Sequence, residues 1–146
     1  MRITVIGLLL FACASSKPVP GAEAKTIRRS IIVFGHRVGY STLTTAPDGT
    51  ITNALDIHDN GRGPHADATL RLAPDGTIAQ LDATGHTELN APVDEHFSIK
   101  GRHAAWHSLE EKGEKDVEGP AFFVPNSATD ADAFLLAALQ RNGGTL

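Results

Sequence analysis

Short runs of alternating apolar and polar residues fill most of the chain, and Gly, Pro, Asp or Asn residues interrupt them. In residues 50–58, Ile51, Asn53, Leu55 and Ile57 fall on one face and polar residues on the other. A period of two is typical of a strand with one buried side and one solvent-facing side. The pattern predicts strands over residues 26–35, 38–46, 50–58, 66–73, 77–90, 93–100, 103–110 and 115–124.

An internal repeat supports this sheet. The sequence Ala-Pro-Asp-Gly-Thr-Ile occurs at Ala46–Ile51 and again at Ala73–Ile78. Pro sets φ for the first corner of a turn and Gly adopts the left-handed conformation that closes a hairpin, so each copy is expected to join two antiparallel strands. Further tight turns are predicted at Gly35–Arg37, Asn90–Pro92, Gly101–Arg102 and Lys112–Glu114. Such short connections favour an antiparallel meander.

The last residues have a different pattern, because Ala and Leu dominate residues 128–141. Ser127–Asp130 is a helix start, and Asn142–Gly144 is a stop signal. Phe134, Leu135, Leu136 and Leu139 form the apolar stripe expected to cover the sheet. We therefore predict a mainly β fold: a curved antiparallel sheet or half-barrel of about seven or eight strands, with one C-terminal helix. The β domain spans residues 25–126, and residues 127–146 hold the helix and a truncated linker.

Residues 1–24 have the layout of a signal peptide. Arg2 is a minimal positive region, Ile3–Ala14 is an apolar core, and Ala22-Glu23-Ala24 is a cleavage site of small residues. This core is shorter than the roughly 20 residues that span a bilayer. We expect export to the periplasm or medium of a bacterium, with the mature chain starting near Lys25. Lipoprotein anchoring through Cys13, the only cysteine, is the less favoured alternative.

Length and charge exclude some classes of protein. The 146 residues suffice for one domain, not for a two-domain enzyme. The net charge of −4 comes from acids and bases mixed along the chain, and no basic stripe of a nucleic-acid-binding protein occurs. Export and charge thus restrict the partners to proteins, to small ligands or, if Cys13 is lipidated, to a membrane.

Histidine is frequent, with seven residues, but the spacing does not favour a metal site. His103 and His107 would chelate one ion on a helix, yet they fall in a predicted strand, where their Cα atoms lie about 13 Å apart. Asp94 and His96 share a strand face that excludes Glu95. No nucleophile motif occurs either. We expect no catalytic residues, no metal site and no cofactor in this chain.

The densest polar cluster is the loop at residues 56–67. It lacks the closing Glu of a calcium-binding EF-hand loop. Our main interpretation is a structural loop, in which Asp59-Asn60-Gly61 makes a turn with Gly61 at positive φ and Pro64 fixes the exit. The Arg62 guanidinium would then bind Asp59, Asp67 or backbone carbonyls. In the alternative interpretation, Arg62 and His65 rim a ligand opening.

Several segments together resemble one family. They are Phe34–Gly39, Asp59–Pro64, Ala73–Gly76 with the leucines before it, Ala91–Phe97, Ala105–Ser108 and Gly119–Pro125. They are similar to the N-terminal region of exported bacterial amidohydrolases of the imidazolonepropionase-like, metal-dependent hydrolase family. The resemblance covers about residues 30–144. Its most specific parts are Asn-Gly-Arg-Gly-Pro in the loop and Ala-Pro-Val-Asp-Glu-x-Phe at residues 91–97.

The resemblance implies a non-catalytic leader domain. The family's (β/α)8 barrel, with its metal-binding residues, would follow position 146, so none of those residues transfers to this chain and a metal would belong to that barrel. Two alternatives remain. One is a periplasmic carrier of a lipid or another apolar ligand, and the other is a purely structural or partner-docking module.

Overall fold

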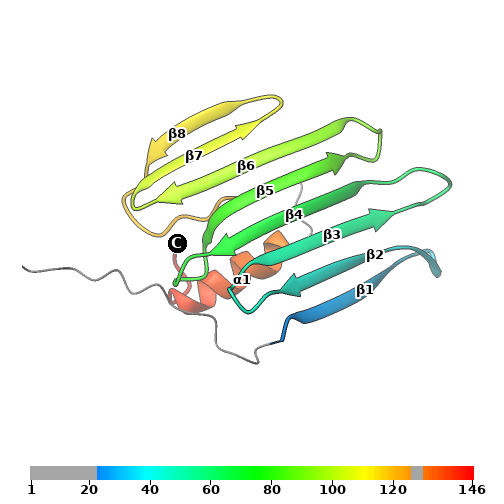
Figure 1. The fold of residues 1–146 in the computed structure, drawn as a ribbon, viewed down its shortest axis with the longest axis horizontal. Helices are drawn as coiled ribbons and strands as arrows, with labels where there is room; N and C mark the ends of the chain where they lie inside the picture. Colours follow the sequence, from blue (N-terminus) through cyan, green and yellow to red (C-terminus); the bar gives the residue numbers. More distant parts are fainter. Residues whose placement is uncertain (1–22, 126–129) are drawn as a thin grey trace, which may run out of the picture.

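The computed structural model describes residues 23–125 and 130–146, and in it eight antiparallel strands form one open sheet in sequence order (Figure 1). The strands are β1 (Lys25–Val33), β2 (His36–Thr45), β3 (Ile51–Ile57), β4 (His65–Leu72), β5 (Ile78–His86), β6 (Pro92–Lys100), β7 (His103–Ser108) and β8 (Lys112–Asp116). One helix, α1 (Ala131–Arg141), follows. The predicted fold class is confirmed. Cys13 and all but the last two positions of the expected signal segment lie outside the described residues.

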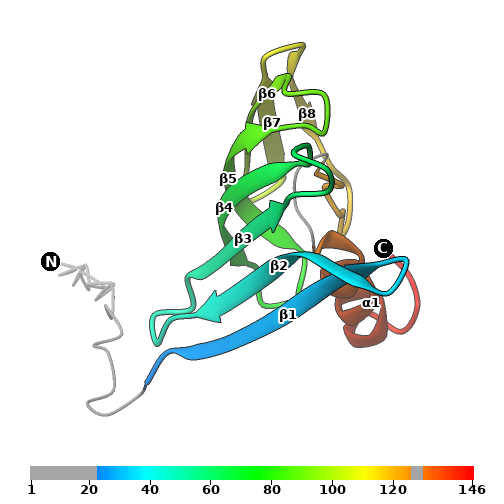
Figure 2. The same cartoon turned by 90° about the vertical axis from the view of Figure 1, so that its right-hand side faces the viewer.

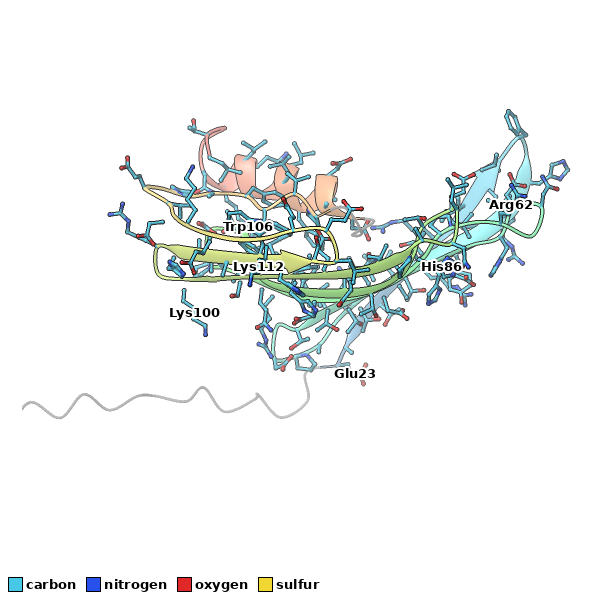
Figure 3. All side chains as sticks on the ribbon, turned by 90° about the horizontal axis from the view of Figure 1, so that it is seen from above. Glu23, Arg62, His86, Lys100, Trp106 and Lys112 are labelled. Atoms are coloured by element: carbon cyan, nitrogen blue, oxygen red, sulfur yellow. The ribbon has the colours of Figure 1, made fainter. Side chains whose placement is uncertain are left out.

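The two faces of the sheet differ, as the alternation predicted. One face carries the core, in which Leu70, Ile78 and Leu81 are fully buried. Figure 3 shows Trp106 on this covered face, on the same side as α1, and Lys100 on the opposite side, which we call the open face. Because successive strand residues point to opposite faces, most polar strand residues lie on the open face, while Ser41, Asn53 and Glu95 are buried.

Both copies of the internal repeat form the predicted hairpins. The Ala46 amide donates to the Thr50 carbonyl at 2.8 Å, and the Ala73 amide donates to the Thr77 carbonyl at the same distance. Each turn is also closed by its aspartate. The Thr50 backbone amide and hydroxyl donate to Asp48 and lower the pKa of that carboxyl. The Thr77 hydroxyl and amide do the same to the pKa of Asp75.

The sheet is curved (Figure 3), and three glycines allow close contacts between its strands. Gly39, Gly63 and Gly85 each lie so close to a backbone carbonyl of the neighbouring strand that a Cβ would overlap it. Glycine is the residue that permits such close approach, and it occurs at bends of curved sheets for this reason.

The covered face is shielded by α1 and by the extended segment 117–125, which lie on the same side of the sheet (Figure 2). The Phe123 ring stacks on that of Phe97 with a centroid separation of 4.3 Å. Phe134 of α1 and Phe122 also pack against the core. The helix therefore completes the core, as expected from its position at the end of the chain.

Polar contacts fix both ends of α1. At its start, Asp130 accepts hydrogen bonds from Arg29 at 2.8 and 3.0 Å and from the buried Asn53 at 3.2 Å. At its end, the Gly144 amide donates to the Leu139 carbonyl, and Gly143 has a φ of 67°. This pattern is a Schellman motif, so the predicted stop signal is confirmed. Of the predicted start, residues 127–129 lie outside the described range.

Several predicted boundaries are wrong. No strand covers residues 117–124, because this segment crosses the covered face as part of the core, and the eighth strand is Lys112–Asp116 instead. The turn predicted at Lys112–Glu114 lies at residues 108–111, where the Ser108 hydroxyl accepts hydrogen bonds from the amides of Glu110 and Glu111. Gly113 stays in β8 because the Trp106 ring packs directly over it.

Two other turns are shifted relative to the prediction. The first hairpin turns at Phe34 and Gly35, with φ of 48° and 82°, so His36 and Arg37 already belong to β2. The predicted strand over residues 77–90 ends at His86, because Thr87 to Asn90 form a turn in which Asn90 has a φ of 63°. Asn tolerates this conformation better than most residues.

Candidate functional site

The loop singled out in the sequence is a tight turn at the tip of the β3–β4 hairpin. Asp59 and Arg62 exchange two backbone hydrogen bonds, at 2.6 and 3.0 Å, around Asn60 and Gly61. Asn60 and Gly61 have φ of 51° and 77°, as in a type I′ turn. Gly61 thus has the positive φ that the sequence predicted. The Pro64 carbonyl accepts from the Ile57 amide and closes the hairpin at 3.1 Å.

Arg62 and His65, the two residues proposed to rim a ligand opening, have different surroundings in the structure. Arg62 is exposed at the tip, and its guanidinium forms no hydrogen bond or ion pair with another described residue, so the expected contact with Asp59, Asp67 or backbone carbonyls is not found there. His65 lies on the open face, with Nε2 3.2 Å from Asp67 and Nδ1 3.6 Å from Asp56. The hollow nearest this loop is lined by residues such as Asp56 and His58, not by Arg62 or His65.

Most histidines of the chain share the open face. His65 stacks on His86 across β4 and β5, and His96 stacks on His107 across β6 and β7, with ring centroids 5.8 and 5.9 Å apart. In β7, His103 is paired with Asp116 of β8 at 3.0 Å rather than with His107. Within residues 23–125 and 130–146, no group of three or more His, Cys, Asp and Glu residues is arranged to hold a metal ion.

His96 has the strongest electrostatic environment on this face. Its Nδ1 lies 2.8 Å from Asp82 and its Nε2 lies 2.9 Å from Asp94. The hydrogen bond with Asp82, followed by that with Asp94, raises the pKa of His96. The same contact lowers the pKa of Asp82. Asp94 and His96 thus share a face as predicted, and Glu95 is buried on the other side of β6.

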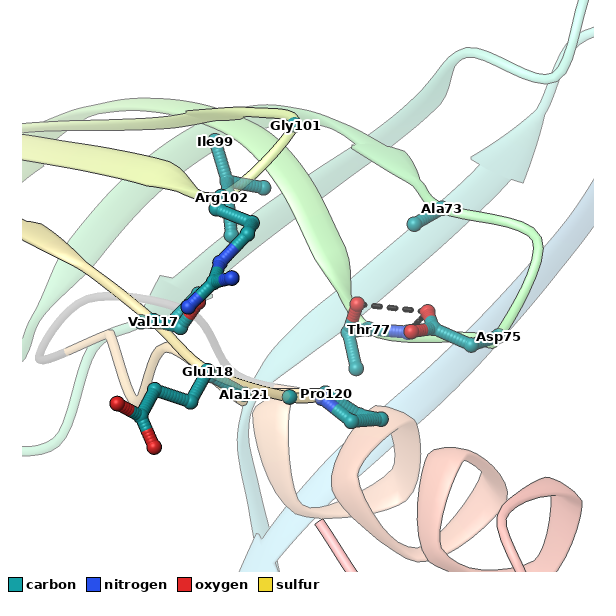
Figure 4. Close-up of a pocket in the computed structure, with 11 residues that line it drawn as sticks. Ala73, Asp75, Thr77, Ile99, Gly101, Arg102, Val117, Glu118, Pro120 and Ala121 are labelled. Carbon is teal, nitrogen blue, oxygen red and sulfur yellow. Dashed lines mark hydrogen bonds between the residues drawn. The ribbon is translucent and has the colours of Figure 1, made fainter.

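A small cavity of about 280 Å³ lies where the β4–β5 and β6–β7 turns meet the segment after β8 (Figure 4). Two of its polar side chains already have partners. Asp75 is bound by Thr77, and Arg102 donates through Nε to the Val117 carbonyl at 3.0 Å. The Val117 amide donates back to the Arg102 carbonyl at 2.8 Å. We interpret this cavity as the joint that holds the covering segment onto the sheet.

A further hollow is formed by α1 and the segment before it, and we call it the α1 groove. It has a volume of about 590 Å³ and is lined mainly by Phe122, Val124, Leu135, Leu139 and Leu146. Val124 is 65% exposed, and the other large apolar side chains of the groove are half-buried. Scattered exposed apolar residues need no explanation, but a contiguous set marks an interaction surface.

The sequence pattern did not predict the α1 groove, because it placed the lining residues in other roles. Phe122 and Val124 were expected in a strand, and the leucines of α1 were expected to face the sheet. In the structure, Ala131 and Ala138 are the buried helix residues, and Leu136 is 58% exposed. Two alanines seven positions apart were the available signal, since small residues allow a helix to approach a sheet closely.

No helix among the described residues is both long and apolar enough to cross a membrane. Comparisons of the chain with protein-family models, curated proteins and solved structures return no match.

Proposed function

We propose that this chain is a non-catalytic β domain that docks onto a hydrolase domain, as in the exported amidohydrolases whose N-terminal region it resembles. The observation that carries the proposal is the α1 groove, which stays exposed although the same helix completes the core. Leu146 itself lines the groove, so residues that follow it in a longer polypeptide would begin at this surface.

Burial energetics support a protein partner for this surface. Leu135 and Leu139 of the groove are half-buried, so a partner that covers them gains part of the about 1.5–3 kcal/mol of a fully buried leucine. Interface cores of this kind are apolar and contain few charged residues. The open face, in contrast, is covered with paired histidines and carboxylates, which are expensive to desolvate. Docking through α1 leaves those groups in water.

The decisive experiment reads the coding region past codon 146 in the source genome. An open frame that encodes a barrel with its His-x-His pair and further metal ligands is the expected result. A stop codon directly after codon 146 would overturn the proposal.

A second experiment separates this proposal from activity in the chain itself. The purified chain, supplied with zinc, should hydrolyse no amide, ester or cyclic imide, because a catalytic zinc needs three protein ligands in fixed geometry. Zinc-dependent turnover that persists in protein repurified to homogeneity would contradict it.

The carrier hypothesis keeps one supporting observation, since the α1 groove is also an apolar surface of ligand size. Native mass spectrometry of the purified chain tests it directly. A co-purifying lipid that disappears in Leu135→Gln, but not in Leu89→Gln, would favour the carrier over the docking domain. Leu89 is a suitable control because it is 83% exposed outside the groove.

A further inference from the structure

The β1–β2 hairpin is electropositive in a chain with a net charge of −4. Residues 24–47 contain Lys25, Arg28, Arg29 and Arg37 and no Asp or Glu. Arg29 points to the covered face, where Asp130 neutralises it at 2.8 Å. Arg28 and Arg37 have no such carboxylate partner among the described residues.

These two arginines line one hollow of about 680 Å³, whose wall also includes Ser30, Tyr40 and His58. Strand pairing brings the residues of this wall together. Ser30 of β1 is paired with Tyr40 of β2, and Tyr40 is paired with Asp56 of β3. Beyond the β-bulge between Ile31 and Ile32, Arg37 is paired with Ile32, so it lies on the same face as Arg28 and Ser30.

Donors in this hollow are unused. The side chains of Arg28, Arg37, Ser30 and Tyr40 make no hydrogen bond to any other residue that the structure describes. The Arg28 guanidinium lies 4.2 Å from the centroid of the Tyr40 ring. Stacking holds the planar guanidinium in place and leaves its N–H groups free for an acceptor.

One carboxylate, Asp56, also lines the hollow and must be counted. It is already engaged, because His58 Nε2 lies 3.0 Å from its Oδ1 and His65 Nδ1 lies 3.6 Å from the same atom. The two arginines therefore outweigh it, and the hollow keeps a net positive charge at neutral pH.

We propose that this hollow binds a phosphate group through Arg28 and Arg37, with Ser30 and Tyr40 as further donors. Guanidinium groups bind phosphate oxygens in a bidentate manner, and such charge-assisted hydrogen bonds are among the strongest in proteins. The same chemistry occurs in a free phosphate compound and in an anionic lipid headgroup.

The test is a titration of the full chain with inorganic phosphate, followed by amide NMR shifts, with sodium chloride at matched ionic strength as the blank. We expect saturable shifts at Ser30, Arg37 and Tyr40. Arg28→Gln combined with Arg37→Gln should weaken binding about tenfold or more, in line with two lost charge-assisted bonds. Tyr40→Phe keeps the stacking and should weaken it only about threefold.

Arg71→Gln is the matched control, because Arg71 is also an exposed arginine of the open face, but it already binds Asp48 at 3.0 Å. It should leave phosphate binding unchanged. Equal weakening in this control, or identical shifts with chloride, would overturn the proposal, and a melt of each variant verifies that it is folded.

A second arm identifies the source of the phosphate. Binding to phosphatidylglycerol vesicles would assign a lipid headgroup, provided that the Arg28/Arg37 variant does not bind them and that the parent chain does not bind phosphatidylcholine vesicles. Binding of inorganic phosphate without vesicle binding would assign a free phosphate compound. Binding in neither arm rejects the site.

Discussion

Gly61 and Arg62 are adjacent in the β3–β4 turn, but we expect them to contribute differently to the stability of the fold. Gly61 has a φ of 77°, and a Cβ there would meet no atom within 4 Å. Gly61→Ala should therefore destabilise the fold by about 1 kcal/mol through backbone strain alone. Thermal melts check this, and Gly119→Ala is the control because its surroundings are equally open and its φ is not left-handed.

Arg62→Ala, in contrast, should change the free energy of unfolding by no more than about 0.5 kcal/mol, as an ordinary surface substitution does, and so should barely move the melting temperature. Its exposed guanidinium binds no other described residue. A loss as large as that of Gly61→Ala would show that Arg62 has a structural contact after all.

His96 gives the open face a predictable response to pH. The raised pKa of His96 means that its contribution is complete below about pH 6.5 and is lost as the pH rises through the folded-state value. The lowered pKa of Asp82 means that its contribution is present above about pH 3.8 and is lost as the pH falls. The pair therefore stabilises most between these limits.

His96→Gln should lower the melting temperature more at pH 5.5 than at pH 8.5. The effect should stay below about 1 kcal/mol, because solvent screens side chains that are 43% and 48% exposed. His36→Gln is the control, since its ring has no bond to another described residue. An equal loss at both pH values would contradict the electrostatic explanation.

At the scale of elements, one glycine allows the last strand to pair closely with its neighbour. Gly113 of β8 lies under the Trp106 ring of β7, where a Cβ would overlap the indole. Gly113→Ala should cost about 1–3 kcal/mol by overpacking and should shift the emission of Trp106, the only tryptophan. In a Trp106→Leu background the penalty should shrink, and a double-mutant cycle measures the difference. Full additivity would mean that the two residues do not interact.

The junction of α1 with the sheet depends on Asp130. Its side chain is 14% exposed and joins Arg29 of β1 to Asn53 of β3. Asp130→Ala should destabilise the chain by about 1–2 kcal/mol, discounted for the 46% exposure of Arg29. Asp132→Ala removes an acid from the first turn of the same helix and should cost less than about 1 kcal/mol. Urea denaturation compares the two, and equal losses would assign the effect to the helix dipole.

At the scale of the whole molecule, one sheet and one short helix share a single core. Far-ultraviolet circular dichroism of the purified chain should show a mainly β spectrum with the contribution of one helix. A helix-dominated spectrum would contradict the fold. The molecule is also electrically uneven, because the basic β1–β2 hairpin lies in a chain that is acidic overall. Long-range steering of an anionic ligand towards that hairpin is the expected consequence.

The sequence by itself determined the meander. Its period-two pattern defined the inward face of β3, and the Pro-Asp-Gly repeats defined two hairpins, because turn chemistry and alternation act over only a few residues. Gly61 at positive φ and the helix stop at Asn142–Gly144 were predictable for the same reason.

Only the tertiary structure decided what the apolar residues near the C-terminus contact. Phe122 and Phe123 have the composition of a strand, but they pack across the covered face, and α1 presents alanines rather than leucines to the sheet. Both outcomes depend on the space left between distant elements. The hollow of Arg28 and Arg37 likewise forms only when β1, β2 and β3 are paired. Local patterns carry no information about such contacts, because their partners lie far apart in the sequence.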